Sequence, residues 1–139
     1  MIKVTRINHS AINTKTPAEL ADMERFYVGV LGMTTVERAI PERLRNMVPG
    51  FWLQFGNGQI HVIQRDPTAK AGAMKGFEGQ RRDPRGPHTA YFVEDIDAAE
   101  QHLITAKIEY DRFEGFIFTA DPAGNMVEFQ QDPECRATA

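Results

Sequence analysis

The chain has 139 residues, of which 42% are hydrophobic and 25% are charged, and its formal net charge is -3. These values are typical of one soluble globular domain with one core, and they argue against a disordered chain. The slightly acidic balance argues against a general nucleic-acid-binding protein, because phosphate binding needs a basic face. We therefore expect a small-molecule ligand.

The distribution of apolar residues and the number of cysteines indicate the cellular compartment and the type of metal ligand to expect. The N-terminal residues contain no apolar run of signal-peptide length, and no later stretch approaches the roughly 20 apolar residues of a membrane span. A cytoplasmic protein without membrane contact is expected. Cys135 is the only cysteine, so no disulfide can form within the chain, and a bound metal would be held by histidine and carboxylate side chains.

The first predicted elements are a strand and a helix. Residues 2–13 are rich in β-branched side chains and predict a strand. Thr16 as N-cap, Pro17 at the first helical position and Glu19 as the partner in a capping box predict a helix that ends near residues 29–32. The apolar side chains that recur at helical spacing are Leu20, Met23, Tyr27 and Leu31.

Three strands are predicted after this helix. They cover residues 33–38, 51–55 and 59–64, and the last two form a hairpin that turns at residues 56–58. The result is a β-α-β-β-β module over about residues 1–65.

The second half of the chain repeats this order. Residues 88–93 predict a strand, Asp95 caps a second helix, and residues 108–113 predict the next strand. Residues 115–120 and 126–131 predict a closing hairpin. The apolar face of the second helix comprises Ile96, Ala99, Leu103 and Ala106. Module two covers about residues 87–132.

Two such modules predict an α+β domain spanning residues 1–139, in which the sheets close around a central metal-bearing cavity and the helices cover the outside. The linker of about residues 66–86 shows no periodicity and is rich in glycine, proline and charged residues. A solvated connector is favoured for it over an anion-binding lid.

Four side chains that can bind a metal occupy matching places in the two modules. His9 and His88 lie in the first strand of their modules, and His61 and Glu128 lie in the last strand. His61 is flanked by two apolar residues, and so is Glu128. Because neighbours in a strand face opposite sides of a sheet, both polar side chains are expected to face the cavity. For His9 and His88 the alternation leaves the orientation open.

Imidazoles and a carboxylate in one cavity suit one divalent metal ion: zinc, nickel, cobalt, manganese or iron(II). A single histidine in a strand is more often structural, so the hypothesis depends on the four residues together. Four protein ligands would leave one or two positions open for water or for two neighbouring substrate oxygens, with the metal as Lewis acid.

Three further groups are weaker candidates. His102 is predicted to be a surface residue, because it lies beside the apolar face of the second helix. Aromatic residues for which a core role is favoured over a pocket wall are Phe51, Trp52 and Phe55. Arginines for which a solubilising role is favoured over carboxylate or phosphate binding are Arg38, Arg43 and Arg45.

Five segments resemble the vicinal oxygen chelate superfamily, which includes glyoxalase I, bleomycin resistance proteins and extradiol dioxygenases. They are INHSAINT (7–14), FYVGVLGM (26–33), IHVIQ (60–64), GPHTAYFVEDIDAAEQHL (86–103) and DPAGNMVEFQ (121–130). The resemblance implies a metal-bearing cavity, a homodimer, and metal ligands at His9, His61, His88 and Glu128. It also marks a departure, because glyoxalase I and methylmalonyl-CoA epimerase usually have Glu or Gln where this chain has His61.

Three functions remain open at this point. The first is a metal-dependent, glyoxalase I-like lyase or isomerase for a small substrate with vicinal oxygens, in which Glu128 accepts a proton. The second is an extradiol-type, ring-cleaving dioxygenase that uses iron(II). The third is a non-catalytic protein that sequesters a drug or metabolite, as bleomycin resistance proteins do. An enzyme is favoured, with the lyase or isomerase first.

Overall fold

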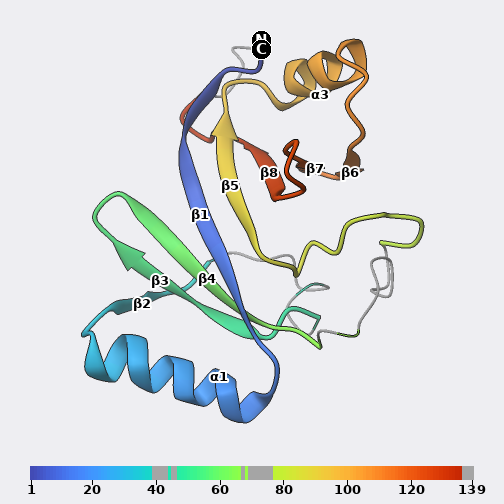
Figure 1. Cartoon of the computed structure of the whole chain (residues 1–139). Helices are drawn as coiled ribbons and strands as arrows, with labels where there is room; N and C mark the ends of the chain where they lie inside the picture. The colour runs from blue at the N-terminus through green and yellow to red at the C-terminus, as the bar shows by residue number, and fades with distance from the viewer. Residues whose placement is uncertain (39–43, 45–46, 67, 69–76, 136–139) are drawn as a thin grey trace.

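A computed structural model describes residues 1–38, 44, 47–66, 68 and 77–135 (Figure 1). The elements of its first half follow the predicted order: β1 (Val4–Thr14), α1 (Pro17–Glu24), η1 (Arg25–Val30), β2 (Thr34–Val36), β3 (Gly50–Phe55) and β4 (Gly58–Gln64). The predicted capping box is present at α1, where the Thr16 hydroxyl accepts a hydrogen bond from the Glu19 amide. The single predicted helix consists of α1 followed by η1, which is a π-helix. Gly32, with a positive φ of 69°, lies just after its end.

The second half repeats this order with the elements β5 (His88–Val93), α3 (Ile96–Thr105), β6 (Asp111–Phe113), β7 (Phe116–Ala120) and β8 (Met126–Gln131). Asp95 caps α3 as predicted, by accepting hydrogen bonds from the Asp97 and Ala98 amides. The strand predicted over 108–113 is shorter in the structure. The chain leaves α3 through Lys107 at a φ of 56°, and this left-handed turn delays the start of β6 to Asp111.

The eight strands form one open sheet in the order β2-β3-β4-β1-β5-β8-β7-β6. The prediction that the sheets close around a cavity is therefore wrong, although the two-module α+β prediction is confirmed. Each module contributes four adjacent strands, and β1 and β5 pair antiparallel at the centre (Figure 1). The edges are β2 and β6, two short strands at opposite ends of the strand order. The sheet is open because β2 and β6 do not pair with each other.

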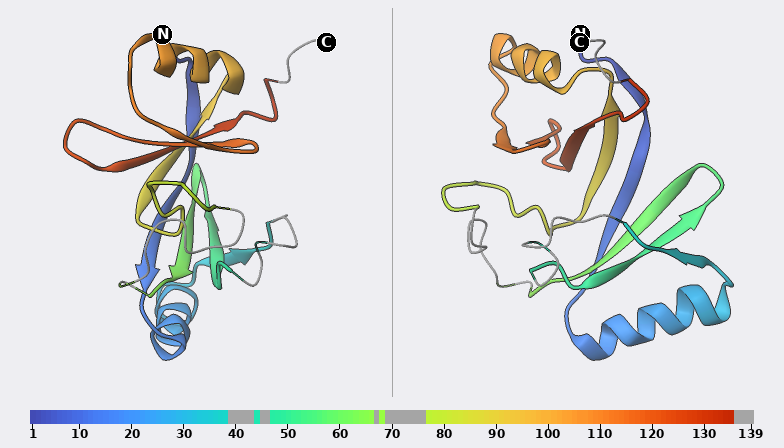
Figure 2. Two further views of the ribbon diagram at one scale, coloured as in Figure 1. Left: turned by 90° about the vertical axis from the view of Figure 1, so that its right-hand side faces the viewer. Right: turned by 180° about the vertical axis from the view of Figure 1, so that it is seen from behind.

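The two helices lie at opposite ends of the molecule (Figures 1 and 2). Helix α3 covers the second module as predicted, and its face packs into a core cluster of Val93, Ile96, Ala99, Leu103, Ile117 and Phe129. Helix α1 contacts β1 and β4 but buries none of its own residues. The prediction that the helices cover the outside is thus met fully by α3 and only in part by α1.

The described end of the linker packs against the second module. Phe77 stacks on Phe113 with ring centroids 3.8 Å apart, and the backbone amides of Arg81 and Arg82 donate hydrogen bonds to Asp111. This part of the linker is therefore an anchored segment that reaches the pocket described below. Residues 67 and 69–76 of the linker lie outside the described residues.

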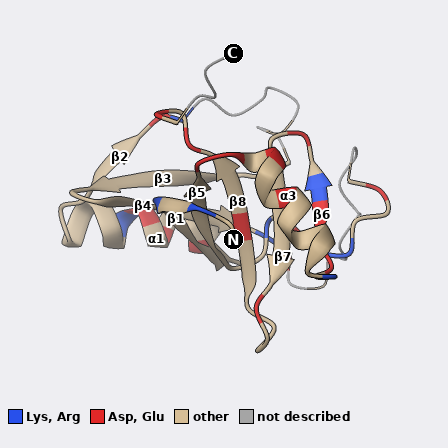
Figure 3. Cartoon of the chain, turned by 90° about the horizontal axis from the view of Figure 1, so that it is seen from above, with Lys and Arg blue, Asp and Glu red and all other residues tan. Residues whose placement is uncertain are grey.

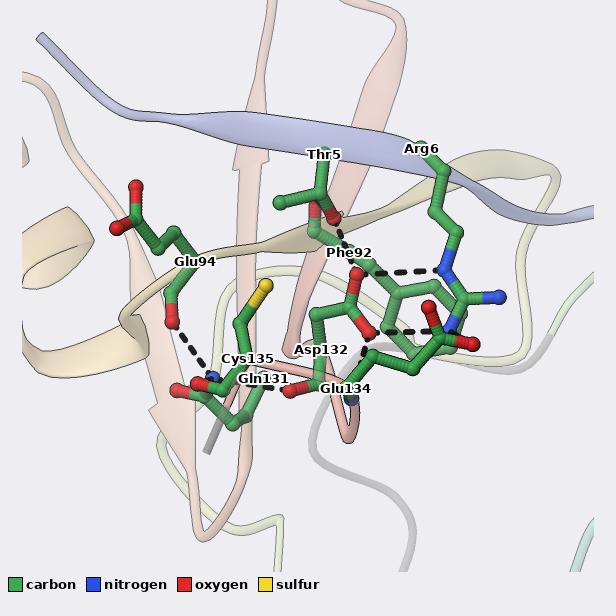
Figure 4. A network of polar contacts seen from close by, with 8 residues as sticks. All are labelled: Thr5, Arg6, Phe92, Glu94, Gln131, Asp132, Glu134 and Cys135. Carbon is green, nitrogen blue, oxygen red and sulfur yellow. Dashed lines mark hydrogen bonds and ion pairs between the residues drawn. The ribbon is translucent and has the colours of Figure 1, made fainter. Parts of the chain in front are cut away.

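The C-terminal segment is fastened to β1 by a polar network (Figure 4). The buried Asp132 carboxylate accepts hydrogen bonds from the Arg6 guanidinium and the Thr5 hydroxyl. Elsewhere, acidic and basic residues are interspersed along the ribbon (Figure 3). None of the helices in the described part of the chain has the length and apolar character needed to span a membrane.

Candidate metal centre

The strand register places the four predicted ligands in a symmetric pattern. His61 of β4 pairs with the residue two positions after His9. Glu128 of β8 pairs with the residue two positions after His88. The two modules therefore use the same offset, and β1 and β5 bring the halves together. The pairwise match inferred from the sequence corresponds to a real equivalence of position in the sheet.

Small residues beneath the site leave room for the rings. Ala11 of β1 pairs with both His88 and His61, and Ala90 of β5 pairs with both His9 and Glu128. Side chains of directly paired residues lie on the same face of a sheet. Both alanines are buried. Each methyl group lies between two larger polar side chains and is too small to fill the space in which those side chains meet.

A β-bulge turns His9 toward this face. Ile7 pairs with Tyr91 and His9 pairs with the adjacent Ala90, which leaves Asn8 as an extra residue in β1. Asn8 and His9 are both buried, at 4% and 2% exposure, whereas Ile7 is 55% exposed. A bulge reverses the alternation of a strand locally and redirects a side chain. This explains why the sequence alternation left the orientation of His9 open.

His9, His88 and Glu128 bring three donor atoms to one point. His9 Nε2 lies 3.2 Å from His88 Nε2, and Glu128 Oε2 lies 2.9 Å from His88 Nε2 and 3.8 Å from His9 Nε2. Ligands bound at about 2.0–2.2 Å around one ion are roughly 3.0–3.5 Å apart at octahedral or tetrahedral angles. The three atoms fit a single divalent metal ion with little movement.

Hydrogen bonds at the far side of each ring orient these histidines. The Arg38 guanidinium donates to Asn8 Oδ1 at 3.0 Å, and the same oxygen lies 3.1 Å from His9 Nδ1. Because arginine is only a donor, the Asn8 atom facing it is the oxygen, and His9 Nδ1 must carry the proton. His88 Nδ1 donates to the Gly86 carbonyl at 2.7 Å. Such contacts hold metal-binding imidazoles with Nε2 directed at the ion.

The electrostatics of the three groups also suit a cation. Burial lowers the pKa of His9 to about 4, so this ring is neutral at pH 7. Burial acts to lower the pKa of His88, but the hydrogen bond and charge interaction with Glu128 and the hydrogen bond to Gly86 together outweigh burial, and the pKa is raised. For Glu128 burial acts to raise the pKa, but its interactions with His88, His9 and Gln130 together bring the pKa below its ordinary value. Metal binding by His88 and Glu128 would release the proton that the hydrogen bond between them requires.

His61 lies beside this group without joining it. Its ring stacks on Trp52 with centroids 3.6 Å apart, and it meets the His9 ring edge-on at 5.9 Å. Burial lowers its pKa far below the ordinary range, which keeps the ring neutral. Among the described residues, the donor atoms within 4.8 Å of one another belong to His9, His88 and Glu128. His61 as a fourth ligand stays a prediction.

A cavity of about 140 Å³ opens over the three donors. Most of its wall is apolar or aromatic, and these residues are Leu44, Val48, Trp52, Ile63, Phe77, Pro84, Phe116 and Phe118. Trp52 is thus a pocket residue, although the sequence favoured a core role. Phe77 and Pro84 come from the linker, so this segment contributes to the site.

Arg38 is the pocket residue that sequence reasoning undervalued. It lies two residues after the end of β2 and lines the cavity, with its guanidinium 4.5 Å from the centre of the Trp52 ring. The signal that could have found it is its place at the end of a strand that pairs with β3, where Trp52 lies. Arg43 and Arg45, grouped with it in the sequence, lie outside the described residues. His102 is exposed on α3, as predicted.

Comparisons with known proteins agree with the fold. Residues 6–129 match the family described as the Glyoxalase/Bleomycin resistance protein/Dioxygenase superfamily. A hypothetical protein from Bacillus halodurans is 20% identical, with a TM-score of 0.63, and the match covers 91% of this chain and 94% of that one. Methylmalonyl-CoA epimerase from Mycobacterium tuberculosis is 22% identical, with a TM-score of 0.61 and coverage of 97% and 93%.

A variant of the Streptomyces coelicolor methylmalonyl-CoA epimerase is 17% identical, with a TM-score of 0.62 and coverage of 94% and 96%. At sequence identities this low, the structural matches show a shared fold and nothing more specific. A search of curated protein sequences finds no match.

Proposed function

The chain belongs to the glyoxalase/bleomycin resistance protein/dioxygenase superfamily, and from this premise we propose that it is a metal-dependent lyase or isomerase of the glyoxalase I type. Its substrate would be a small molecule that binds through two neighbouring oxygens. The observation that carries the proposal is the meeting of His9 Nε2, His88 Nε2 and Glu128 Oε2 at the base of a mainly apolar pocket.

The residues of the site support this chemistry in distinct ways. A bound divalent ion would act as a Lewis acid that stabilises negative charge on the substrate oxygens. His9 and His88 would hold it through nitrogens that their hydrogen-bond partners already orient. The apolar wall excludes water and strengthens charge interactions inside the pocket.

Glu128 is the proposed proton acceptor. Its Oε2 faces the two histidines, while its Oε1 accepts a hydrogen bond from the Gln130 side-chain amide, which fixes the plane of the carboxylate. If a bound metal polarised two neighbouring substrate oxygens, the proton on the adjacent carbon would become more acidic, and the Glu128 carboxylate would be the group to accept it. Proton removal next to a carbonyl is also the chemistry of an epimerase, and one structure of this fold is methylmalonyl-CoA epimerase in complex with methylmalonyl-CoA.

The metal hypothesis is tested by elemental analysis of protein purified without an affinity tag. We expect about one divalent ion per chain in the wild type, and a loss of most of it in His9→Ala, His88→Ala and Glu128→Ala. His61→Ala decides whether the fourth predicted ligand contributes. His102→Ala, at an exposed histidine, is the matched control. Full metal content in both Glu128→Ala and His61→Ala would overturn the assignment.

The reaction class is tested with the metal-loaded protein. A hydroxamate that mimics an enediolate should bind tightly to the metal-loaded wild type and weakly to the wild type after treatment with a chelator, as measured by calorimetry. Exchange of a substrate proton with deuterated solvent, lost in Glu128→Gln while the metal is retained, would support Glu128 as the acceptor.

A ring-cleaving dioxygenase is the second candidate, because one observation favours it. Two histidines and one carboxylate with open positions are typical of non-heme iron(II) oxygenases, and these are the three residues that the structure groups. Oxygen consumption with catechols after anaerobic loading with iron(II) separates the two candidates. Oxygen uptake at a rate that exceeds proton exchange would favour the dioxygenase.

A further inference from the structure

Arg38 places a positive charge inside the candidate active site. Its side chain is partly buried and lines the same cavity as His9, His88 and Glu128. Within the part of the chain that the structure describes, no carboxylate lies within ion-pair distance of it. A shielded guanidinium without a carboxylate partner is costly unless something in the pocket balances its charge. Burial lowers its pKa, and the more distant Glu128 only partly opposes this effect.

The position of this guanidinium is fixed rather than adaptable. It lies 4.5 Å from the centre of the Trp52 ring, a stacking contact that suits arginine. One of its nitrogens, Nη1, donates to Asn8 Oδ1. Within the described residues this is its one hydrogen bond, so none of those residues takes up the remaining N–H groups of the guanidinium. A planar fork with free donors matches the two oxygens of a carboxylate.

The charges of the loaded site point to the same ligand. A divalent ion held by His9, His88 and Glu128 would bring two positive charges next to the guanidinium of Arg38, against the single carboxylate of Glu128. The pocket would therefore be strongly positive and would favour an anion. A compact carboxylate fits a cavity of about 140 Å³ with one guanidinium, whereas a phosphate dianion is usually held by several donors.

We propose that Arg38 forms a carboxylate subsite, so that the substrate carries a carboxylate close to the oxygens that reach His9, His88 and Glu128. The inference rests on the proposed function for the identity of those oxygens. The competing possibility is that Arg38 only positions His9 through Asn8. In that case a change at Arg38 would alter metal binding without altering the choice between charged and neutral ligands.

The test compares two ligands that differ only in charge. Succinic monohydroxamate carries a free carboxylate, and its carboxamide analogue is neutral and nearly the same size. Both are titrated calorimetrically into zinc-loaded wild type, Arg38→Gln, Arg38→Lys and the control Arg25→Gln, which removes an exposed arginine of η1. The zinc content of every sample is measured beside the titration.

Wild type and Arg25→Gln should prefer the carboxylate ligand by at least about tenfold, the value of one good charge-assisted contact. Arg38→Gln should bind the two ligands within about twofold of each other, and Arg38→Lys should keep part of the preference. Equal binding of both ligands by the wild type, or an unchanged preference in Arg38→Gln, would overturn the proposal.

A second experiment, on protein without metal, tests the carboxylate subsite independently of the metal hypothesis. Succinate and its diamide are titrated into chelator-treated wild type and Arg38→Gln. A preference for succinate that depends on Arg38 would support the carboxylate subsite even if the wild type held no metal or Arg38→Gln lost its zinc. Absence of that preference in the wild type would count against the subsite, whatever the metal analysis shows.

Discussion

Asn8 shows how one residue decides the geometry of the site. It is the extra residue of the β-bulge in β1, and its side-chain oxygen links Arg38 to His9 Nδ1. The bulge sets the face on which His9 lies, and the hydrogen bond sets which ring nitrogen is free to bind a metal. Neither effect follows from strand alternation, because alternation assumes an unbroken ladder.

A substitution at Asn8 should therefore weaken metal binding without removing a ligand. We expect Asn8→Ala to lower zinc affinity about 10- to 100-fold, the usual effect of losing the outer partner of a metal-binding histidine. Asn8→Asp retains an oxygen acceptor and should restore most of the affinity. Competition with a chromogenic chelator measures both. Wild-type affinity in Asn8→Ala would show that His9 is oriented by the sheet alone.

At the scale of elements, the two helices use similar caps but pack differently. Thr16 caps α1 and Asp95 caps α3, each through hydrogen bonds to amides of the first turn. Helix α3 buries Ile96, Ala99 and Leu103 in the core of its module, whereas α1 buries none of its residues. The stability of α3 is therefore coupled to the whole fold, and α1 can open with little exposure of the core.

This difference predicts unequal costs for removing the two caps. Asp95→Ala should lower the global free energy of unfolding by about 1 kcal/mol. Thr16→Ala should lower it by less than about 0.5 kcal/mol, because the cost is a local opening of α1. Urea denaturation measures the global effect, and hydrogen exchange of the α1 amides measures the local one. Equal global losses would show that α1 unfolds together with the sheet.

At the scale of the whole molecule, hydrogen bonds from Thr5 and Arg6 to Asp132 join the segment after β8 to the central strand β1 (Figure 4). The hydrogen bond from Arg6, with help from the Thr5 hydroxyl, holds the pKa of Asp132 well below its usual range. Its ionised form is therefore favoured by folding. The ionised Asp132 carboxylate therefore contributes to the free energy of unfolding above the pKa of about 3.9 that it has in the unfolded chain. This contribution is lost as the pH falls toward the pKa of Asp132 in the folded protein.

Asp132→Asn should consequently lower the free energy of unfolding at pH 7 by about 2 kcal/mol, as expected for hydrogen bonds to a charged group. The difference between this variant and the wild type should shrink below about pH 4 as the wild-type carboxylate is protonated. Denaturation curves from pH 2 to pH 7 measure both effects. Glu134→Gln is the control, because that carboxylate is exposed and its contact with Arg6 should contribute less than about 1 kcal/mol. If the difference in free energy of unfolding between Asp132→Asn and the wild type stayed constant with pH, the stabilising role of the ionised Asp132 would be contradicted.

The homodimer implied by the family resemblance stays a prediction. Apolar side chains do lie exposed on η1 and next to it, including Phe26, Val30 and Leu31. Exposed apolar residues of this kind are common at interfaces. The mass of the purified protein in solution, compared with the chain mass of 15.7 kDa, answers the question directly.

Much of this protein can be predicted from its sequence because the determinants are local. The capping residues Thr16 and Asp95, the apolar spacing of α3 and the alternation around His61 and Glu128 act over a few residues, and each is visible in the chain itself. The repeat of one order of elements then predicts two equivalent modules, and with them the equivalence of His9 to His88 and of His61 to Glu128.

What only the tertiary structure decided depends on contacts between distant parts of the chain. The sheet stays open because its edge strands β2 and β6 do not pair, and His9 turns inward because a bulge forms against β5. Three of the four predicted ligands meet, while His61 stacks on Trp52, because side-chain packing selects among geometries that the register permits. Arg38 enters the pocket for the same reason: stacking on Trp52 and donation to Asn8 exist only after three separate strands have come together.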